Sequence, residues 1–111
     1  MTAEKNTGRR LWRLHTKIAS ENGAQILFID GRLDHAATTE LEKAAAAHAP
    51  DGSGDLHIDL SGVDYLSSAA LKVFEELADR LSRNGGRLRL RAPSVAARLS
   101  LEFSGLERLV D

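Results

Sequence analysis

The sequence contains no cysteine, few aromatic residues and no long apolar run. Without cysteine, the chain has no disulfide bonds, no thiolate nucleophile and no thiolate metal ligands. No apolar stretch approaches the roughly 20 residues needed to span a bilayer, and the polar N-terminus lacks the apolar core of a secretory signal. We therefore predict a cytoplasmic protein with no direct membrane insertion. With aromatic residues at 5%, the core must consist mainly of Leu, Ile, Val and Ala.

An excess of positive charge is also absent. The chain carries 15 Lys and Arg against 16 Asp and Glu, which gives a formal net charge of −1. Nucleic-acid-binding proteins usually have a basic excess, because the release of counterions from phosphates drives much of their affinity. We therefore expect no nucleic-acid partner. The alternating Arg and Leu residues of 87–91 are interpreted as a strand with one solvated face.

The N-terminal half of the chain predicts two strands and a helix. Residues 1–10 are polar and aperiodic, and we interpret them as a flexible lead-in to a single domain over 11–111. Alternation of apolar and polar residues indicates a half-buried strand, and an Asn-Gly pair favours a tight turn. In order, we predict a strand over 12–19, a turn at 21–23, a strand over 24–29, a break over 30–34, a helix over 35–48 and a loop over 49–54.

The C-terminal half predicts two further strands and two further helices. The first of these helices has an amphipathic stripe at steps of three and four residues and ends at an Asn-Gly-Gly sequence. The second follows a proline and has Ser94 as its predicted N-cap. In order, we predict a strand over 56–60, a turn at 61–62, a helix from Ser67 or Ser68 to about 84, a strand around 88–90, and a helix whose apolar stripe is Val95, Leu99 and Phe103.

The element order is therefore β-β-α-β-α-β-α. Strands joined by a short turn pair antiparallel, whereas strands joined through helices are parallel. The fold class is thus α/β, with a four-stranded mixed sheet that begins with an antiparallel hairpin and packs against helices.

Motifs for catalysis, cofactors and metals are missing. There is no phosphate-binding loop, no dinucleotide-binding glycine pattern and no nucleophile elbow. The four histidines are scattered, and none forms a metal-ligand pair. Asp30 and Asp34 lie four residues apart, and loop solvation or compensation of helix charge explains them as well as a carboxylate pair would. We therefore predict no cofactor, no metal and no enzymatic activity.

The most informative segment runs from Asp59 to Leu71, where a strand gives way to a helix that opens with Ser67 and Ser68. A serine at this position has its hydroxyl beside backbone N–H groups without helical partners and near the positive end of the helix dipole. Such a serine can cap the helix. It can also carry a phosphate, whose negative charge is favoured there.

This segment resembles the signature of STAS domains, the family of anti-sigma factor antagonists and of the cytoplasmic tails of sulfate transporters. The family pattern has an Asp-x-Ser strand end and then Asp-Ser-Ser/Thr-Gly-Leu at a helix start. Asp59-Leu60-Ser61 matches the first part and Leu71 the last leucine, and residues 31–34 resemble the family's Gly-x-Leu-Asp. The likeness extends over about 11–110, including Gly105-Leu106 near the end. Ser67, Ala69 and Ala70 stand where the family has Asp, Ser/Thr and Gly.

The resemblance implies a protein-binding switch rather than an enzyme. In the antagonist branch, an anti-sigma factor that is also a serine kinase phosphorylates the serine after the signature aspartate, and a phosphatase removes the phosphate. That serine corresponds here to Ser68, with Ser67 as the alternative acceptor. The expected partner-binding residues are Asp30, Gly31, Asp34, Asp64, Tyr65, Ser67, Ser68 and Lys72.

Two other functions remain open. The altered signature favours a STAS adaptor that is not phosphorylated, for example one that docks on the ATPase of a lipid-transport ABC system. STAS relatives also suggest a sensor of a small ligand, although no phosphate-binding motif supports it. The oligomeric state is open as well.

Overall fold

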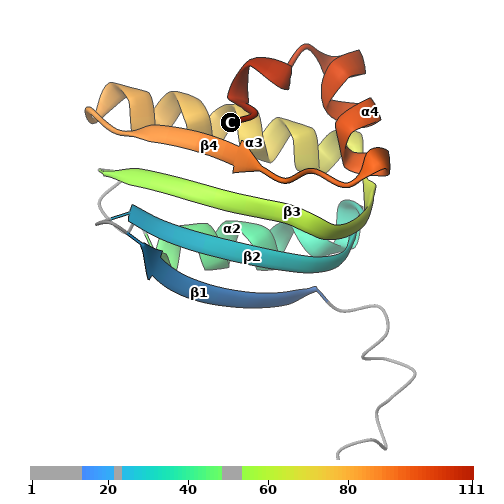
Figure 1. The fold of residues 1–111 in the computed structure, drawn as a ribbon, viewed down its shortest axis with the longest axis horizontal. Helices are drawn as coiled ribbons and strands as arrows, with labels where there is room; N and C mark the ends of the chain where they lie inside the picture. The colour runs from blue at the N-terminus through green and yellow to red at the C-terminus, as the bar shows by residue number, and fades with distance from the viewer. Residues whose placement is uncertain (1–13, 22–23, 49–53) are drawn as a thin grey trace, which may run out of the picture.

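The computed structural model describes residues 14–21, 24–48 and 54–111. These residues form a four-stranded sheet with helices α2 and α3 side by side behind it (Figure 1). The predicted lead-in over 1–10, the first residues of the predicted first strand, most of the predicted turn at 21–23, and 49–53 of the predicted loop lie outside this range. In chain order the elements are β1 (His15–Glu21), β2 (Ala24–Leu33), η1 (His35–Ala37), α2 (Thr38–His48), β3 (Asp55–Leu66), α3 (Ser68–Arg83), β4 (Arg87–Arg91), α4 (Val95–Ser104) and η2 (Glu107–Leu109).

The strands lie in the order β1-β2-β3-β4, which confirms the predicted mixed sheet. β1 and β2 pair antiparallel, from His15 opposite Asp30 to Glu21 opposite Ala24. β2 and β3 pair parallel, as do β3 and β4. β2 and β3 therefore occupy the interior of the sheet, and β4 lies at one edge. In the part of the chain that is described, no helix is long and apolar enough to cross a membrane.

The hydrophobic core lies between the sheet and the two helices behind it. Leu56, Ile58 and Leu60 alternate along β3 and are fully buried, as the period-2 pattern predicts. α3 buries one face of its amphipathic pattern against them, with its N-cap at Ser67 and its C-cap at Asn84. The buried residues of that face are Ala70, Phe74, Leu77 and Leu81.

β2 and β3 are longer than predicted. β2 continues through the predicted break to Leu33, and β3 continues through the predicted turn at 61–62 to Leu66. The register between them shifts after Phe28 and again after Gly31, which has a φ of +121°. Such a bulge bends a strand without ending its ladder. Gly62 belongs to the same feature, because a Cβ there would overlap the Asp30 carboxylate. The polar and glycine residues at the predicted break and at the predicted turn over 61–62 therefore belong to bulged strands.

The predicted apolar stripe of α4 is wrong. Val95, Leu99 and Phe103 are 79%, 51% and 91% exposed, and the helix buries Ala97 and Leu101 instead. Ser94, just before the helix, sets its rotation. Its hydroxyl donates to the Val63 carbonyl and accepts from the Ala97 N–H at 3.1 Å, which confirms the predicted N-cap.

The predicted helix over 35–48 begins differently from the prediction. Its first turn is the 3₁₀ helix η1, and the α-helical part starts at Thr38. Leu41 and Ala45 are buried, as their helical spacing predicts. On β4, Leu88 and Leu90 are buried, and the alternating arginines lie at the opposite, solvated face.

Candidate functional site

The carboxyl ends of β2 and β3 bring two predicted segments together. Arg32 pairs with Tyr65 and Leu33 with Leu66 in the parallel register. The Ser67 N–H then donates to the Leu33 carbonyl at 2.9 Å, so the start of α3 is joined directly to the end of β2. The segments 30–34 and 64–68 consequently lie side by side at the N-terminal end of α3.

Ser67 is the N-cap of α3. Its backbone is extended, with φ −79° and ψ 164°. Its Oγ accepts from the Ala70 N–H at 3.1 Å, and its carbonyl accepts from the Leu71 N–H at 3.0 Å. The residue is only 9% exposed. The hydroxyl of Ser67 is therefore enclosed and already committed to the helix.

Replacing Ser67 by alanine should lower the free energy of unfolding by about 1 kcal/mol, because the buried Ala70 N–H loses its acceptor. The matched control is Ser68→Ala, which removes a hydroxyl that has no hydrogen bond to any described residue. We expect that change to stay within about 0.5 kcal/mol of the wild type. Urea denaturation at 25 °C measures both. Equal effects of the two substitutions would contradict the assignment of Ser67 as the cap.

Ser68 is the first helical residue of α3, and it is exposed. The N–H groups of Ser68 and Ala69 have no hydrogen-bond partner among the described residues. The first turn of α3 also contains no acidic side chain. Unpartnered amides and the positive end of the helix dipole favour a negative group at this position. Ser68 thus combines an accessible hydroxyl with surroundings that stabilise an anion.

The neighbouring predicted residues have different roles. Asp34 caps η1, since its Oδ1 accepts from the Ala37 N–H at 3.0 Å. Asp30 and Asp64 are exposed. Gly31 is the left-handed residue of the bulge and has no side chain to present. The structure therefore places Asp30 and Asp64 at the surface, whereas Asp34 supports the local backbone.

Arg32 lies within the predicted segment 30–34, but its contact with Tyr65 was not predicted. Its guanidinium carbon lies 4.4 Å from the centroid of the Tyr65 ring, a cation–π geometry. Tyr65 is itself 42% exposed, an unusual position for a large aromatic side chain. The pair arises from the bulged register, which the sequence pattern did not reveal.

The Asp-x-Ser part of the signature has a structural role here. Asp59 is 8% exposed, and its Oδ1 accepts from the Ser61 N–H at 3.0 Å and from the Ser61 Oγ at 2.6 Å. The Arg91 Nε lies 3.9 Å from the other carboxylate oxygen. These contacts satisfy a carboxylate within β3 and hold the strand where its register with β2 shifts.

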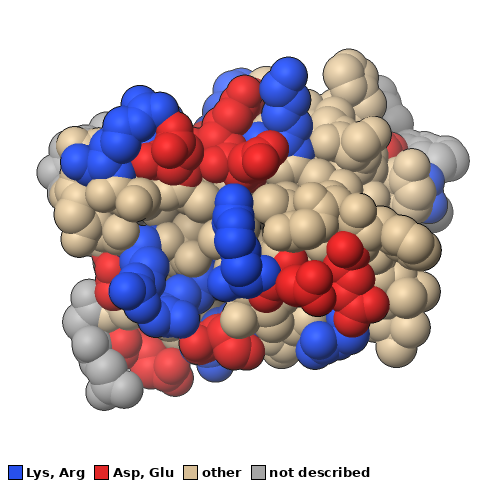
Figure 2. All heavy atoms as spheres, turned by 90° about the horizontal axis from the view of Figure 1, so that it is seen from above, with Lys and Arg blue, Asp and Glu red and all other residues tan. Residues whose placement is uncertain are grey.

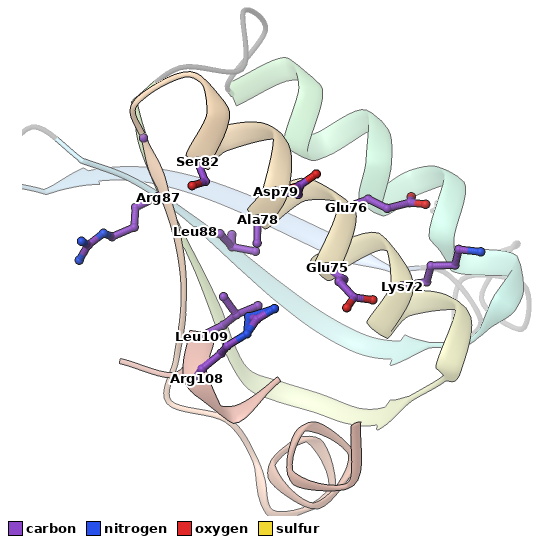
Figure 3. Close-up of a pocket in the computed structure, with 11 residues that line it drawn as sticks. Lys72, Glu75, Glu76, Ala78, Asp79, Ser82, Arg87, Leu88, Arg108 and Leu109 are labelled. Carbon is purple, nitrogen blue, oxygen red and sulfur yellow. The ribbon is translucent and has the colours of Figure 1, made fainter. Parts of the chain in front are cut away.

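Lys72 is exposed on α3, one turn beyond Ser68. It also lines a groove of about 740 Å³ between α3, β4 and η2. Figure 2 shows acidic and basic side chains around this hollow, and Figure 3 shows Glu75 and Arg108 extending into the space between α3 and η2. Because charges of both signs line the groove, it does not select an anion or a cation. Apart from Lys72, none of the predicted site residues lies in it.

The family model described as "Mlab, STAS domain" matches residues 16–111. The chain belongs to the STAS domain family. Its mixed sheet and helix order are those of the fold that the sequence resemblance implied. No group of three His, Asp or Glu residues that could hold a metal ion occurs in the described parts of this STAS domain.

This STAS domain is similar to proteins that are named anti-sigma factor antagonists. It is 31% identical over 67 residues to the anti-sigma-F factor antagonist RsfB of Mycobacterium tuberculosis, an alignment that covers 60% of this chain and only 55% of RsfB. An anti-sigma factor antagonist from Mycobacterium paratuberculosis superposes with a TM-score of 0.76 at 27% identity, over 86% of this chain and 80% of the other. Unphosphorylated SpoIIAA, at 17% identity, shares the fold with a TM-score of 0.73 over 88% and 85%.

Proposed function

We propose that this STAS domain is an anti-sigma factor antagonist, controlled by phosphorylation of Ser68. In its unphosphorylated form it binds an anti-sigma factor that is also a serine kinase, and so frees the sigma factor. Phosphorylation ends the binding, and a phosphatase restores it. The observation that carries the proposal is the exposed Ser68 hydroxyl beside two unpartnered helix amides, within a chain similar to named antagonists.

Ser68 is a better acceptor than Ser67 on geometric grounds. A kinase must bring its nucleotide and catalytic base to the hydroxyl, which requires access from solvent. Ser67 is enclosed, and its Oγ is occupied by the Ala70 N–H. Ser68 needs no rearrangement of the helix start. The kinase supplies ATP, the metal ion and the base, so the STAS domain contributes only the hydroxyl and a docking surface.

The docking surface is the exposed part of the β2–β3 carboxyl edge together with the first turns of α3. Its side chains are Asp30, Arg32, Asp64, Tyr65, Ser68 and Lys72. Phosphorylation of Ser68 places a charge of about −1.5 to −2 on this surface. A partner that packs closely on a neutral Ser68 would have to desolvate that charge, which explains how one modification releases it.

The test is incubation with ATP and the serine-kinase anti-sigma factor encoded nearest to this chain. The wild type and Ser67→Ala should each gain one phosphate by intact mass, and Ser68→Ala none. In calorimetry, Ser68→Glu should weaken binding of the kinase at least about tenfold, the equivalent of 1.4 kcal/mol. Ser82→Glu, which places the same charge at an exposed site near the other end of α3, should bind as the wild type does.

A STAS adaptor that is not phosphorylated is the second candidate. Ala69 and Ala70, which replace the Ser/Thr and Gly of the signature, favour it. For an adaptor, the wild type, Ser68→Ala and Ser68→Glu would all bind the partner, for example the ATPase of a transporter, equally well. Absence of both phosphate transfer and kinase binding would overturn the antagonist proposal. Tight binding to an ATPase that is insensitive to Ser68→Glu would establish the adaptor instead.

A further inference from the structure

The outer face of α4 is apolar and uncovered by the described part of the chain. Val95, Leu99 and Phe103 follow one another at steps of four residues and are 79%, 51% and 91% exposed. They lie on the side of the helix opposite Ala97 and Leu101, which contact the core. Figure 1 shows α4 at a corner of the molecule, apart from α2. A row of large apolar side chains that points directly away from the core marks an interaction surface.

The residues beside this row are arranged so that the face complements itself. Arg98 and Glu102 are both exposed and lie four residues apart on one side of the row. When two identical helices pack antiparallel around a two-fold axis, each side of one helix meets the same side of the other in reverse order. Arg98 of one copy then faces Glu102 of the second, and the reverse pair forms at the same time.

The opposite side of the row favours close approach. Ala96 and Ser100 are small, so no long side chain holds two helices apart there. Val95 and Phe103 lie at the two ends of the row, and antiparallel packing sets the small residue of one copy against the large residue of the other. Leu99 lies near the two-fold axis. Shape and charge therefore both match a second copy of the same helix.

We propose that α4 forms an antiparallel, two-fold contact between two copies of this chain. The contact area is small, because three apolar side chains from each copy form its centre. Stable interfaces bury about 800 Å² on each partner. We therefore expect a weak dimer with a Kd between about 10 μM and 1 mM, formed where the local concentration is high. This dimer does not depend on the proposed binding of an anti-sigma factor.

Charge exchange at Arg98 and Glu102 gives a test that only self-association can satisfy. Sedimentation equilibrium on the purified chain at low ionic strength, across a concentration series, yields the Kd without any partner present. Arg98→Glu sets two glutamates against each other in both pairs, and Glu102→Arg sets two arginines against each other. Each variant alone should dimerise about 5- to 30-fold more weakly than the wild type, because two attractive pairs become repulsive.

Mixing the two variants should restore association, since every contact between Arg98→Glu and Glu102→Arg molecules joins opposite charges. The double variant should likewise regain wild-type dimerisation. Phe103→Glu should abolish the dimer and leave the circular dichroism spectrum unchanged, because the side chain is almost fully exposed. A wild type that stays monomeric up to about 1 mM, or a mixture that associates no better than its components, would overturn the proposal. Retention of the dimer in Phe103→Glu would do the same.

Discussion

Phe74→Ala is expected to lower the free energy of unfolding by about 3–5 kcal/mol. Phe74 is 0% exposed and is the largest of the fully buried side chains, in the middle of the buried face of α3. The substitution loses the favourable free energy of burying an aromatic ring. It also leaves a cavity, because the close-packed surroundings relax only in part. A small domain has only about 5–15 kcal/mol of stability in total. The substitution should therefore consume much of it.

The matched control is Phe103→Ala, the same substitution at a side chain that is 91% exposed. It should change the unfolding free energy by no more than about 0.5 kcal/mol. Urea denaturation at low protein concentration compares the two variants, so that association through α4 does not contribute. A loss in Phe74→Ala as small as the one expected for Phe103→Ala would show that Phe74 is not central to the core.

α3 also links the core to the candidate site. Its buried face anchors the helix on the sheet, and its first turn positions the cap at Ser67 and the exposed Ser68. Loss of packing at Phe74 would therefore loosen the end of the helix that presents the hydroxyl. A core substitution and a surface substitution at Ser68 can both reduce partner binding, but only the first also lowers the unfolding free energy.

Much of the fold could be predicted because the spacing of the apolar residues agrees with the positions of the residues that end helices and strands. Leu56, Ile58 and Leu60 alternate, the buried residues of α3 recur at three and four positions, and Asn84 begins a sequence that ends the helix. Each local pattern points to the same layered sheet. The sequence failed where a polar residue or glycine serves a bulge, as at Gly31 and Gly62, because a bulge and a turn use the same residue types.

The rotation of α4 could not be predicted from periodicity. Val95, Leu99 and Phe103 have helical spacing, and Ala97 and Leu101 are also one turn apart. Hydrophobicity alone favours the larger set. The structure selects the smaller set because Ser94 is bonded to Val63 of β3 and fixes which side of the helix meets the sheet. That contact joins residues far apart in sequence, and no local pattern contains it.

The candidate site was predicted in outline but not in detail. Two serines at the start of a helix can be read from the sequence, but a shift of one position decides which of them is the cap. Ser67 became the cap because its N–H bonds to Leu33 at the end of β2. The partnership of Arg32 with Tyr65 likewise depends on the bulged register between β2 and β3.

Gly86→Ala is expected to destabilise the fold by about 3 kcal/mol, toward the upper end of the usual cost of overpacking. A Cβ at Gly86 would overlap the carbonyl oxygen of Gly54 and lie 2.6 Å from its carbon and 2.9 Å from its nitrogen. These are backbone atoms, so no side-chain rotation relieves the overlap. The strain falls where β3 and β4 begin to pair, next to the bond from the Arg87 N–H to the Gly54 carbonyl at 3.4 Å.

The adjacent Gly85→Ala is the matched control. Gly85 has a φ of +84° and no atom within 4 Å of a Cβ built there, so alanine should cost only about 1 kcal/mol of left-handed backbone strain. Each Gly→Ala change lowers the conformational entropy of the unfolded chain by the same amount, so this effect cancels when the two variants are compared. In Gly86→Ala, hydrogen exchange at Arg87 should also accelerate, because its N–H donates to the Gly54 carbonyl at the start of the β3–β4 pairing, where the overlap falls. A greater loss of stability in Gly85→Ala than in Gly86→Ala would contradict the close approach of Gly86 to Gly54.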